Sequence, residues 1–383
     1  MDAGAGVYVA LGWWSLGTAL HWASAAIARK GRAAVPQRHS AGDFSIVAPM
    51  KGAADASPVY VAALAGLAWA GSEVLICVAS EEDGAVAATR SLWPEAPILV
   101  GLADTFNPKM NNVAKGLEAA TRPVVALCDA GIAIGLDELR AAAAPLSMEV
   151  GLVLALKVGT EPDGFAAEME RAYINGHQAR FLLAADGIGM AVASGGITLL
   201  ENATLHRIGN WRGFNRWIAD DYSVVRSVRE LGLKTVLGDR LQRLPLGRRE
   251  GAAVWRRQVR WARTRLRLPV WPLVAFEPLV GATVTGLAGI VGLIGLGAGP
   301  GTTAAFAVGH VAAWLAAEKW FLAGRGLGFG LRAALAALTR EALAPVLMVQ
   351  ALASRTIDWR GADLGDRWRT SGAAQIRKQG DGS

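Results

Sequence analysis

Val124-Val-Ala-Leu-Cys128-Asp129-Ala130-Gly131 is the stretch that sets the fold, because it reads as a buried strand that ends on a carboxylate. A short, continuous apolar run is consistent with a strand in the interior of a sheet. In sheets of parallel strands, ligands gather beyond the carboxyl ends of the strands. We therefore expect Asp129 at the edge of a cleft.

Similar strand-like runs precede this stretch, with helical patterns between them. We expect strands over residues 44–48, 73–78, 98–100 and 124–128, and helices over residues 59–70, 85–92 and 112–120. Strands separated by helices of this length imply right-handed crossovers. The predicted fold class is α/β, with a mostly parallel mixed sheet. Cys77 and Cys128 lie inside two of the strands and are expected to be reduced core residues.

The composition indicates a membrane protein. The chain has 383 residues, 52% of them hydrophobic, and a mean hydropathy of +0.30, which is too apolar for an ordinary soluble enzyme. Residues 6–27 contain no acidic or basic side chain and can span a bilayer. Lys30, Arg32 and Arg38 follow this segment, which predicts an external N-terminus. A cleaved signal peptide is the weaker alternative, because its basic residues would precede the apolar stretch.

Apolar segments return after residue 269. Residues 270–296 and 302–322 are candidate spans. Residues 333–353 are interrupted by Arg340 and Glu341 and are expected to be re-entrant or interfacial, because charges in mid-bilayer are costly. We expect an integral protein of a bacterial inner membrane with its catalytic domain in the cytoplasm. The predicted parts are an N-terminal transmembrane helix and linker (1–40), a cytosolic catalytic domain (41–268), a C-terminal membrane region (269–353) and a cytosolic tail (354–383).

The excess of basic over acidic residues in the chain indicates contact with a membrane surface. The formal charge is +7 and the pI is near 9.7, values that also occur in nucleic-acid-binding proteins. Many of the arginines flank apolar segments, however, where basic residues mark the cytoplasmic side. We therefore expect no nucleic-acid partner.

Polar residues that could form a site follow several of the expected strands. Four acidic residues lie just after these strands or in a short acidic cluster. For each of them except Asp129, a solvated charge in a loop is the simpler interpretation. They are Asp83, Asp129, Asp220 and Asp221.

Two lysines have two open interpretations. Lys51 follows the first strand, and Lys109 lies in Asn107-Pro-Lys-Met-Asn-Asn112. A lysine can neutralise a phosphate and an asparagine can hydrogen-bond a base or ribose. Equally, this stretch can be a loop that starts a helix, with Asn111 or Asn112 as its N-cap.

An arginine- and tryptophan-rich run extends from Trp255 to Arg267. Arg257, Arg260 and Trp261 have the spacing of one helical face, where guanidinium groups could bind a diphosphate. A basic belt at the membrane surface is the alternative. His177 belongs to no group with metal-ligand spacing, so a zinc centre is not expected.

Together these motifs resemble the membrane glycosyltransferases with a GT-A nucleotide-sugar-binding domain, and most closely the ceramide glucosyltransferases. That family combines an N-terminal transmembrane helix, a cytosolic domain with a D, D, D, (Q/R)xxRW signature and a hydrophobic C-terminal region. The resemblance covers nearly the whole chain. It rests on Cys77-Val78 with Asp83, Asn107 to Asn112, Cys128-Asp129-Ala-Gly-Ile132, Gly164-Phe165 leading to Tyr173 and His177, Ala219-Asp-Asp-Tyr222, and Arg257-Gln-Val-Arg260-Trp261.

The resemblance implies an inverting enzyme that moves a sugar, glucose in the first instance, from a UDP-sugar to the primary hydroxyl of a ceramide-like lipid in the bilayer. It makes Asp221 the general base and places a magnesium or manganese ion at Asp129. His177 and Asp220 are expected to contact the acceptor or the donor. Donor binding is assigned to Lys51, Asp83, Lys109, Asp129, Arg257, Arg260 and Trp261.

One departure from the family pattern bears on the metal. The stretch Asp129-Ala130-Gly131 offers one carboxylate where the generic GT-A motif, Asp-x-Asp, has two. The acceptor could also be a hopanoid or another membrane lipid, and the sugar could be glucuronic acid, galactose or N-acetylglucosamine. A processive polysaccharide synthase and a non-catalytic membrane scaffold are less favoured alternatives.

Overall fold

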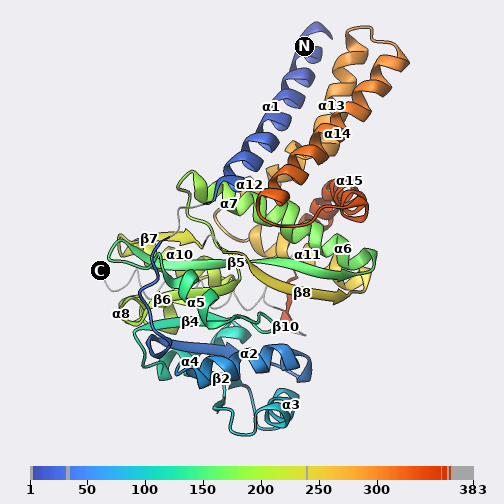
Figure 1. The fold of residues 1–383 in the computed structure, drawn as a ribbon. Helices are drawn as coiled ribbons and strands as arrows, with labels where there is room; N and C mark the ends of the chain where they lie inside the picture. The colour runs from blue at the N-terminus through green and yellow to red at the C-terminus, as the bar shows by residue number, and fades with distance from the viewer. Residues whose placement is uncertain (1–2, 32–34, 239, 355, 360–361, 364–383) are drawn as a thin grey trace. The chain divides into compact units, whose positions relative to one another are not determined.

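The computed structural model describes residues 3–31, 35–238, 240–354, 356–359 and 362–363 (Figure 1). The chain forms two compact units. The helical unit consists of Met1–Gly31, Gly159–Gly189 and Pro245–Arg355, and the sheet unit of Arg32–Val158, Met190–Leu244 and Thr356–Ser383. Residues from three separate parts of the chain thus make up each unit. Most of the predicted cytosolic tail lies outside the described residues.

The sheet unit is built on a mixed sheet with the strand order β3-β2-β1-β4-β6-β5-β7, and β8 pairs with β5. Neighbours from β3 to β4 are parallel, as are β5 and β7, whereas β6 is antiparallel to both β4 and β5. The predicted α/β fold with a mixed sheet is therefore confirmed. The strands are β1 (Phe44–Pro49), β2 (Glu73–Val78), β3 (Ile98–Val100), β4 (Val124–Cys128), β5 (Val150–Asp163), β6 (Gly196–Glu201), β7 (Lys234–Leu237) and β8 (Gln242–Arg248).

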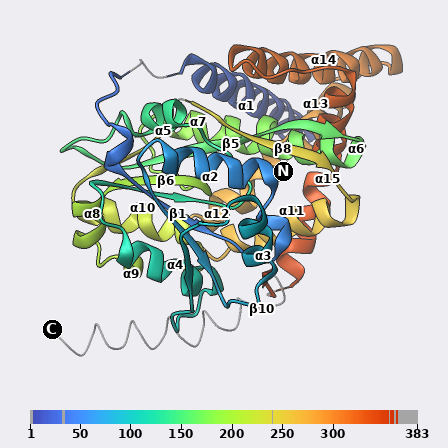
Figure 2. The same cartoon turned by 60° about the horizontal axis from the view of Figure 1, so that its bottom comes forward.

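The first four strands match the expected ranges, because each is a short apolar run. Ile46, Ile76 and Ala126 are completely buried in the core. Helix α4 packs closely on β1 and β2 (Figure 2). A Cβ at Gly116 in this helix would lie 2.6 Å from Cys77 Sγ and 2.7 Å from Val47 Cγ1, so the contact requires glycine.

The sheet unit has seven α-helices in the described residues, besides the short 3₁₀ turns η1 (Ala41–Asp43) and η2 (Ala53–Asp55). The first three agree with the predicted helices except that α4 begins earlier than expected. The α-helices are α2 (Pro58–Trp69), α3 (Gly84–Leu92), α4 (Pro108–Ala119), α5 (Leu136–Ala143), α8 (Asn202–Arg207), α9 (Trp211–Phe214) and α10 (Asp220–Glu230). A two-stranded pair, β9 (Asp358–Trp359) and β10 (Ala362–Asp363), follows near the C-terminus.

In the helical unit, α1 runs alongside α13 and α14 (Figure 1). Small residues allow this approach, because a Cβ at Gly292 would lie 2.6 Å from the side chain of Leu11. The elements are α1 (Ala3–Lys30), α6 (Phe165–Arg171), the π-helix η3 (Ala172–Ala179), α7 (Arg180–Gly187), α11 (Gly251–Arg265), α12 (Trp271–Phe276), η4 (Glu277–Val280), α13 (Ala282–Gly295), α14 (Pro300–Gly324) and α15 (Leu331–Ala353).

One helix of the described chain is long and apolar enough by itself to cross a membrane, and this is α15, which contains the segment that was expected to be re-entrant or interfacial. A second span is possible if α12 and η4 form one bent element with α13, with a bend of 51°. Helices α1 and α14 contain the expected spans 6–27 and 302–322, but neither is the described helix that is long and apolar enough by itself. Those two spans therefore stay predictions.

Arg340 and Glu341, the two charged residues in the middle of α15, are paired within the helical unit. Arg340 Nη2 lies 2.8 Å from Glu318 Oε2 of α14 and 2.7 Å from Glu341 Oε1. Arg340 and Glu318 are each only 1% exposed, and Arg340 Nη1 also donates to the Ala172 carbonyl at 2.7 Å. Mutual pairing offsets the cost of burying these charges. The pair thus explains how a charged interruption fits in an apolar helix.

Candidate functional site

Lys109 joins two of the predicted site aspartates in the sheet unit. Its Nζ lies 2.8 Å from Asp129 Oδ1 and 2.6 Å from Asp220 Oδ2. Asp129 follows strand β4, Asp220 opens helix α10, and Lys109 stands in the first turn of α4. Three residues that are far apart in the sequence therefore meet, and with Asp221 and Lys157 we call them the lysine–carboxylate cluster.

Opposite charges hold Asp129 and Lys109 in their ionised forms. Burial alone would raise the pKa of the Asp129 carboxyl, but the nearby Lys109 and Lys157 outweigh it and the pKa lies below its ordinary value. Burial would likewise lower the pKa of Lys109, but Asp129 and Asp220 outweigh it and raise the pKa. The cluster therefore presents fixed charges of both signs at neutral pH.

Asp221 behaves differently from its neighbours. Burial, followed by repulsion from Asp220, raises the pKa of its carboxyl to about 6. The side chain is only partly enclosed, and its Oδ1 accepts a 2.8 Å hydrogen bond from the Tyr222 amide. A carboxylate with a pKa near the working pH is well matched to taking a proton from a hydroxyl.

The asparagines around Lys109 have structural partners. Asn107, and not Asn111 or Asn112, caps α4, because its Oδ1 accepts from the Lys109 amide at 2.9 Å. Asn112 Nδ2 donates to the carbonyls of Met50 at 3.2 Å and Cys77 at 2.8 Å. This buried amide joins the ends of β1 and β2. A helix does begin in this stretch, but the expected cap at Asn111 or Asn112 was wrong, because the helix starts four residues earlier. The phosphate interpretation of Lys109 stays a prediction.

Asp83 and Lys51 lie beyond the ends of β2 and β1. Asp83 caps α3 through a 2.9 Å bond from Ala85 N, and the same Oδ1 accepts from Gly52 N at 2.7 Å. Gly52 has a φ of +76°, which favours glycine. Asp83 thereby fixes the loop that carries the exposed Lys51. The donor-binding roles of both residues stay predictions.

Lys157 is a member of the cluster that the sequence analysis missed. It lies on β5, where it is the one charged residue in the apolar run 150–160. A Cβ at Gly195 would lie 3.4 Å from Asp129 Oδ2 and 3.9 Å from Lys157 Nζ. A lysine inside an otherwise apolar strand was the signal that could have identified it. The glycine-rich turn before β6 makes room for both side chains.

The cluster can hold a divalent cation only together with a ligand. The described residues include no group of three or more His, Cys, Asp or Glu side chains that could hold a metal ion. Asp129 and Asp220 are both paired with Lys109. Magnesium is often bound by one or two carboxylates, several waters and the phosphates of a substrate. One carboxylate with a diphosphate therefore fits the ion that was predicted at Asp129.

The predicted arginines lie on α11 in the helical unit. Arg257 pairs with Glu170, and Arg249 Nε lies 3.0 Å from the same carboxylate. Glu170 is only 1% exposed, so the two guanidinium groups compensate a buried charge. Arg260 and Trp261 are half-buried on the same helix. Donor binding by these three residues of the motif stays a prediction.

His177 lies in the π-helix η3 of the helical unit. Its Nε2 is 3.5 Å from Glu277 Oε2, and Arg265 Nη1 contacts both oxygens of Glu277 at 2.7 and 2.9 Å. π-helical segments occur often at functional sites. The contact of His177 with a donor or acceptor stays a prediction.

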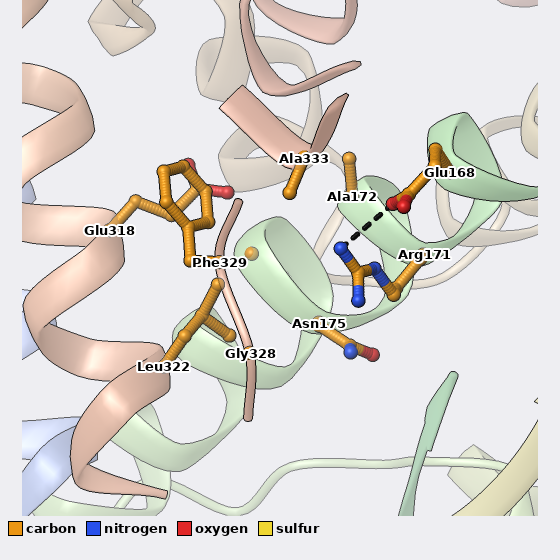
Figure 3. Close-up of a pocket in the computed structure, with 10 residues that line it drawn as sticks. Glu168, Arg171, Ala172, Asn175, Glu318, Leu322, Gly328, Phe329 and Ala333 are labelled. Atoms are coloured by element: carbon orange, nitrogen blue, oxygen red, sulfur yellow. Dashed lines mark ion pairs between the residues drawn. The ribbon is translucent and has the colours of Figure 1, made fainter. Parts of the chain in front are cut away.

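The helical unit also contains a small cavity beside the Glu168–Arg171 ion pair (Figure 3). Its volume is about 10 Å³, and Asn175, Glu318 and Phe329 are among the residues that line it. That volume is near the lower limit for one water molecule. The cavity is therefore no sugar or lipid site.

A known protein family and several known proteins match the sequence of this chain. Residues 8–371 match the family described as glycosyl transferase family 21. Ceramide glucosyltransferase 1 of Caenorhabditis elegans is 27% identical over 320 residues, which cover 79% of this chain and 68% of that protein. Ceramide glucosyltransferase 3 of the same organism is 25% identical over 304 residues, which cover 75% and 65%. The chain thus spans about two thirds of the length of these relatives.

One solved structure has a similar fold along most of the chain. It is a mannosyltransferase from Pyrobaculum calidifontis in complex with GDP-Man and Mn²⁺, with a TM-score of 0.52 and 15% sequence identity. The match covers 89% of this chain and 99% of that one. At this identity the likeness shows the fold alone.

Proposed function

Because this chain belongs to glycosyl transferase family 21, we propose that it transfers a sugar from a UDP-sugar to the primary hydroxyl of a membrane lipid. Glucose and a ceramide-like acceptor are the first choices, in keeping with the names of its relatives. The observation that carries the proposal is the lysine–carboxylate cluster, in which the Asp221 carboxyl, with a pKa of about 6, lies near Lys109, while Lys109 and Lys157 both act on Asp129.

Four residues of the cluster take part in the proposed reaction. Asp221 takes the proton from the acceptor hydroxyl as its oxygen attacks the anomeric carbon. Lys109 and Lys157 oppose the negative charge that develops on the diphosphate as the bond to the sugar breaks. A single displacement inverts an α-linked donor to a β-glycoside. When bound, magnesium or manganese would add Lewis-acid stabilisation of the leaving diphosphate, with Asp129 as its protein ligand.

The location follows from the same proposal. A soluble nucleotide sugar and a lipid can meet where a catalytic domain lies against a bilayer. We propose an integral protein of a bacterial inner membrane with its sheet unit in the cytoplasm, and α15 is the described helix whose length and apolarity best support this.

The decisive experiment presents the full-length protein, in lipid nanodiscs, with a panel of UDP-sugars and lipid acceptors. We expect UDP release and a product whose mass equals ceramide plus one hexosyl residue, that is, one hexose less one water, as detected by mass spectrometry. A product formed on a hopanoid, or with glucuronic acid, galactose or N-acetylglucosamine, would change the substrates but keep the reaction. No UDP release with any lipid would contradict the proposal and favour a scaffold.

The raised pKa of Asp221 predicts a specific pH dependence. The base must be ionised, so kcat/KM should rise with pH through about 6, the pKa of the Asp221 carboxyl. Asp220→Asn removes a negative neighbour, which lowers the pKa of Asp221 and moves the acid limb to lower pH. The measurement is kcat/KM against pH for both proteins. If kcat/KM of the wild type instead rises near the ordinary pKa of an aspartate, Asp221 is not a base with a raised pKa.

The (Q/R)xxRW motif predicts a donor-binding role for Arg260. Arg260→Ala should raise the KM for the UDP-sugar by about tenfold or more, because a charged hydrogen bond contributes roughly 1.5–3 kcal/mol. Arg256→Ala is the matched control, since Arg256 is exposed on the same helix. If both variants keep the wild-type KM and UDP affinity, the arginine run is a membrane belt only.

A further inference from the structure

The Lys109 ammonium group lies between two carboxylates, at a position where a metal cation would otherwise be expected. Its Nζ contacts Asp129 Oδ1 at 2.8 Å and Asp220 Oδ2 at 2.6 Å, and its side chain is only 19% exposed. The lysine comes from α4, whereas its partners come from the end of β4 and the start of α10. One ammonium group therefore joins three elements of the sheet unit.

The charges around Asp129 are nearly balanced before any ligand binds. Lys109 and Lys157 are positive, and the carboxyls of Asp129 and Asp220 are negative, with Asp221 as a third acidic neighbour. A divalent cation approaching Asp129 would meet both ammonium groups at close range. Such a cation also needs about six oxygen ligands. Repulsion and missing ligands both disfavour the metal in the ligand-free protein.

We propose that Lys109 is an internal counter-cation, which keeps a divalent metal from Asp129 until a nucleotide diphosphate is present. A diphosphate supplies oxygens for the metal and a new anionic partner for the lysine. Lys109 can then move from the carboxylates to the phosphates. Metal and nucleotide consequently strengthen each other's binding, because coupling between two ligands is reciprocal. The inference rests on the proposed function only in taking the nucleotide diphosphate as the ligand.

The first test measures Mn²⁺ binding by electron paramagnetic resonance in full-length protein without any sugar. Without UDP, the wild type should leave Mn²⁺ largely free. With UDP, it should bind more Mn²⁺ than the same concentration of UDP binds without protein. Lys109→Met should bind Mn²⁺ without UDP, with a Kd lower by about tenfold or more, because a nearby positive charge is gone. Adding Asp129→Asn to this variant should restore weak binding.

Two control variants define the effect. Lys109→Arg keeps the positive charge and should resemble wild type, and Lys234→Met changes an exposed lysine whose ion pair with Glu149 lies on the surface. Equal Mn²⁺ affinity of wild type and Lys109→Met would overturn the proposal. Binding by Lys109→Met that survives Asp129→Asn would overturn it as well.

A second measurement uses the wild type and does not depend on the folding of a variant. Acetylation of lysines, followed by mass spectrometry, should modify Lys109 much more slowly than the exposed Lys51 and Lys234. Millimolar Mn²⁺ without UDP should leave the rate at Lys109 unchanged. A faster reaction at Lys109 with Mn²⁺ alone would show that the metal displaces the lysine unaided, and would overturn the proposal.

These outcomes are separable from those that test the proposed function. Both measurements follow a metal or a lysine and require no transfer of sugar. If Mn²⁺ binds as expected with UDP but no lipid is glycosylated, the counter-cation stands and the transferase proposal fails. If lipid is glycosylated while wild type binds Mn²⁺ tightly without UDP, the reverse holds.

Discussion

Asp221→Asn should lower kcat by about 10²–10⁴-fold, the usual contribution of a general base. The amide has nearly the same shape as the carboxyl but cannot accept the proton of the acceptor hydroxyl. UDP affinity should change little, since Asp221 is assigned to the acceptor. The measurement is turnover with a saturating UDP-sugar and lipid, together with UDP binding by calorimetry.

Asp137→Asn is the matched control, because the Asp137 side chain is 91% exposed at the start of α5. It should leave both turnover and UDP affinity unchanged. Wild-type-like turnover in Asp221→Asn would remove Asp221 as the base. Loss of UDP binding together with turnover would instead place the residue in the donor site.

Arg340→Met should destabilise the helical unit by about 3–5 kcal/mol, the typical cost of removing one partner of a buried ion pair. Glu318 and Glu341 would then lie close together without a positive charge, since both contact the Arg340 guanidinium. The measurement is the free energy of unfolding in detergent, from denaturant titration followed by circular dichroism.

Two further variants separate charge from packing at this position. Arg332→Met, at an exposed position of the same helix, should have little effect. Combining Arg340→Met with Glu318→Gln and Glu341→Gln should recover much of the lost stability, because no unpaired charge stays buried. If Arg340→Met alone is as stable as the wild type, the ion pair contributes nothing to the helical unit.

The strands around the site could be predicted because their sequences are simple. The runs that became β1, β2 and β4 are short and apolar, so strand was the simplest interpretation. The order of the strands in the sheet was harder to predict. Strand β6 lies antiparallel between β4 and β5, and this arrangement depends on contacts between distant segments. The same holds for the division into two units, each assembled from separate parts of the chain.

Several residues of the candidate site could be named from the sequence for similar reasons, and their roles stay predictions. Asp129 and Asp221 were recognisable from their place after a strand and in an acidic cluster. Lys109 was recognised as a charge that could meet phosphate, but its two carboxylate partners lie 20 and 111 residues away in the sequence. Lys157 was missed, although it is the one charged residue in the apolar run 150–160. Its significance depends on the neighbouring strand order, which the sequence does not reveal.

The packing of α4 on the sheet limits which substitutions the protein can accept during evolution. Gly116 leaves no room for a side chain against Cys77 and Val47, and Lys109 stands seven residues earlier on the same helix. At 1.5 Å per residue the two are about 10 Å apart, within one rigid rod. A methyl group at Gly116 would tilt that rod and shift the ammonium at its other end. The placement of the Lys109 charge thus limits the choice of residue at Gly116, a buried position seven residues away.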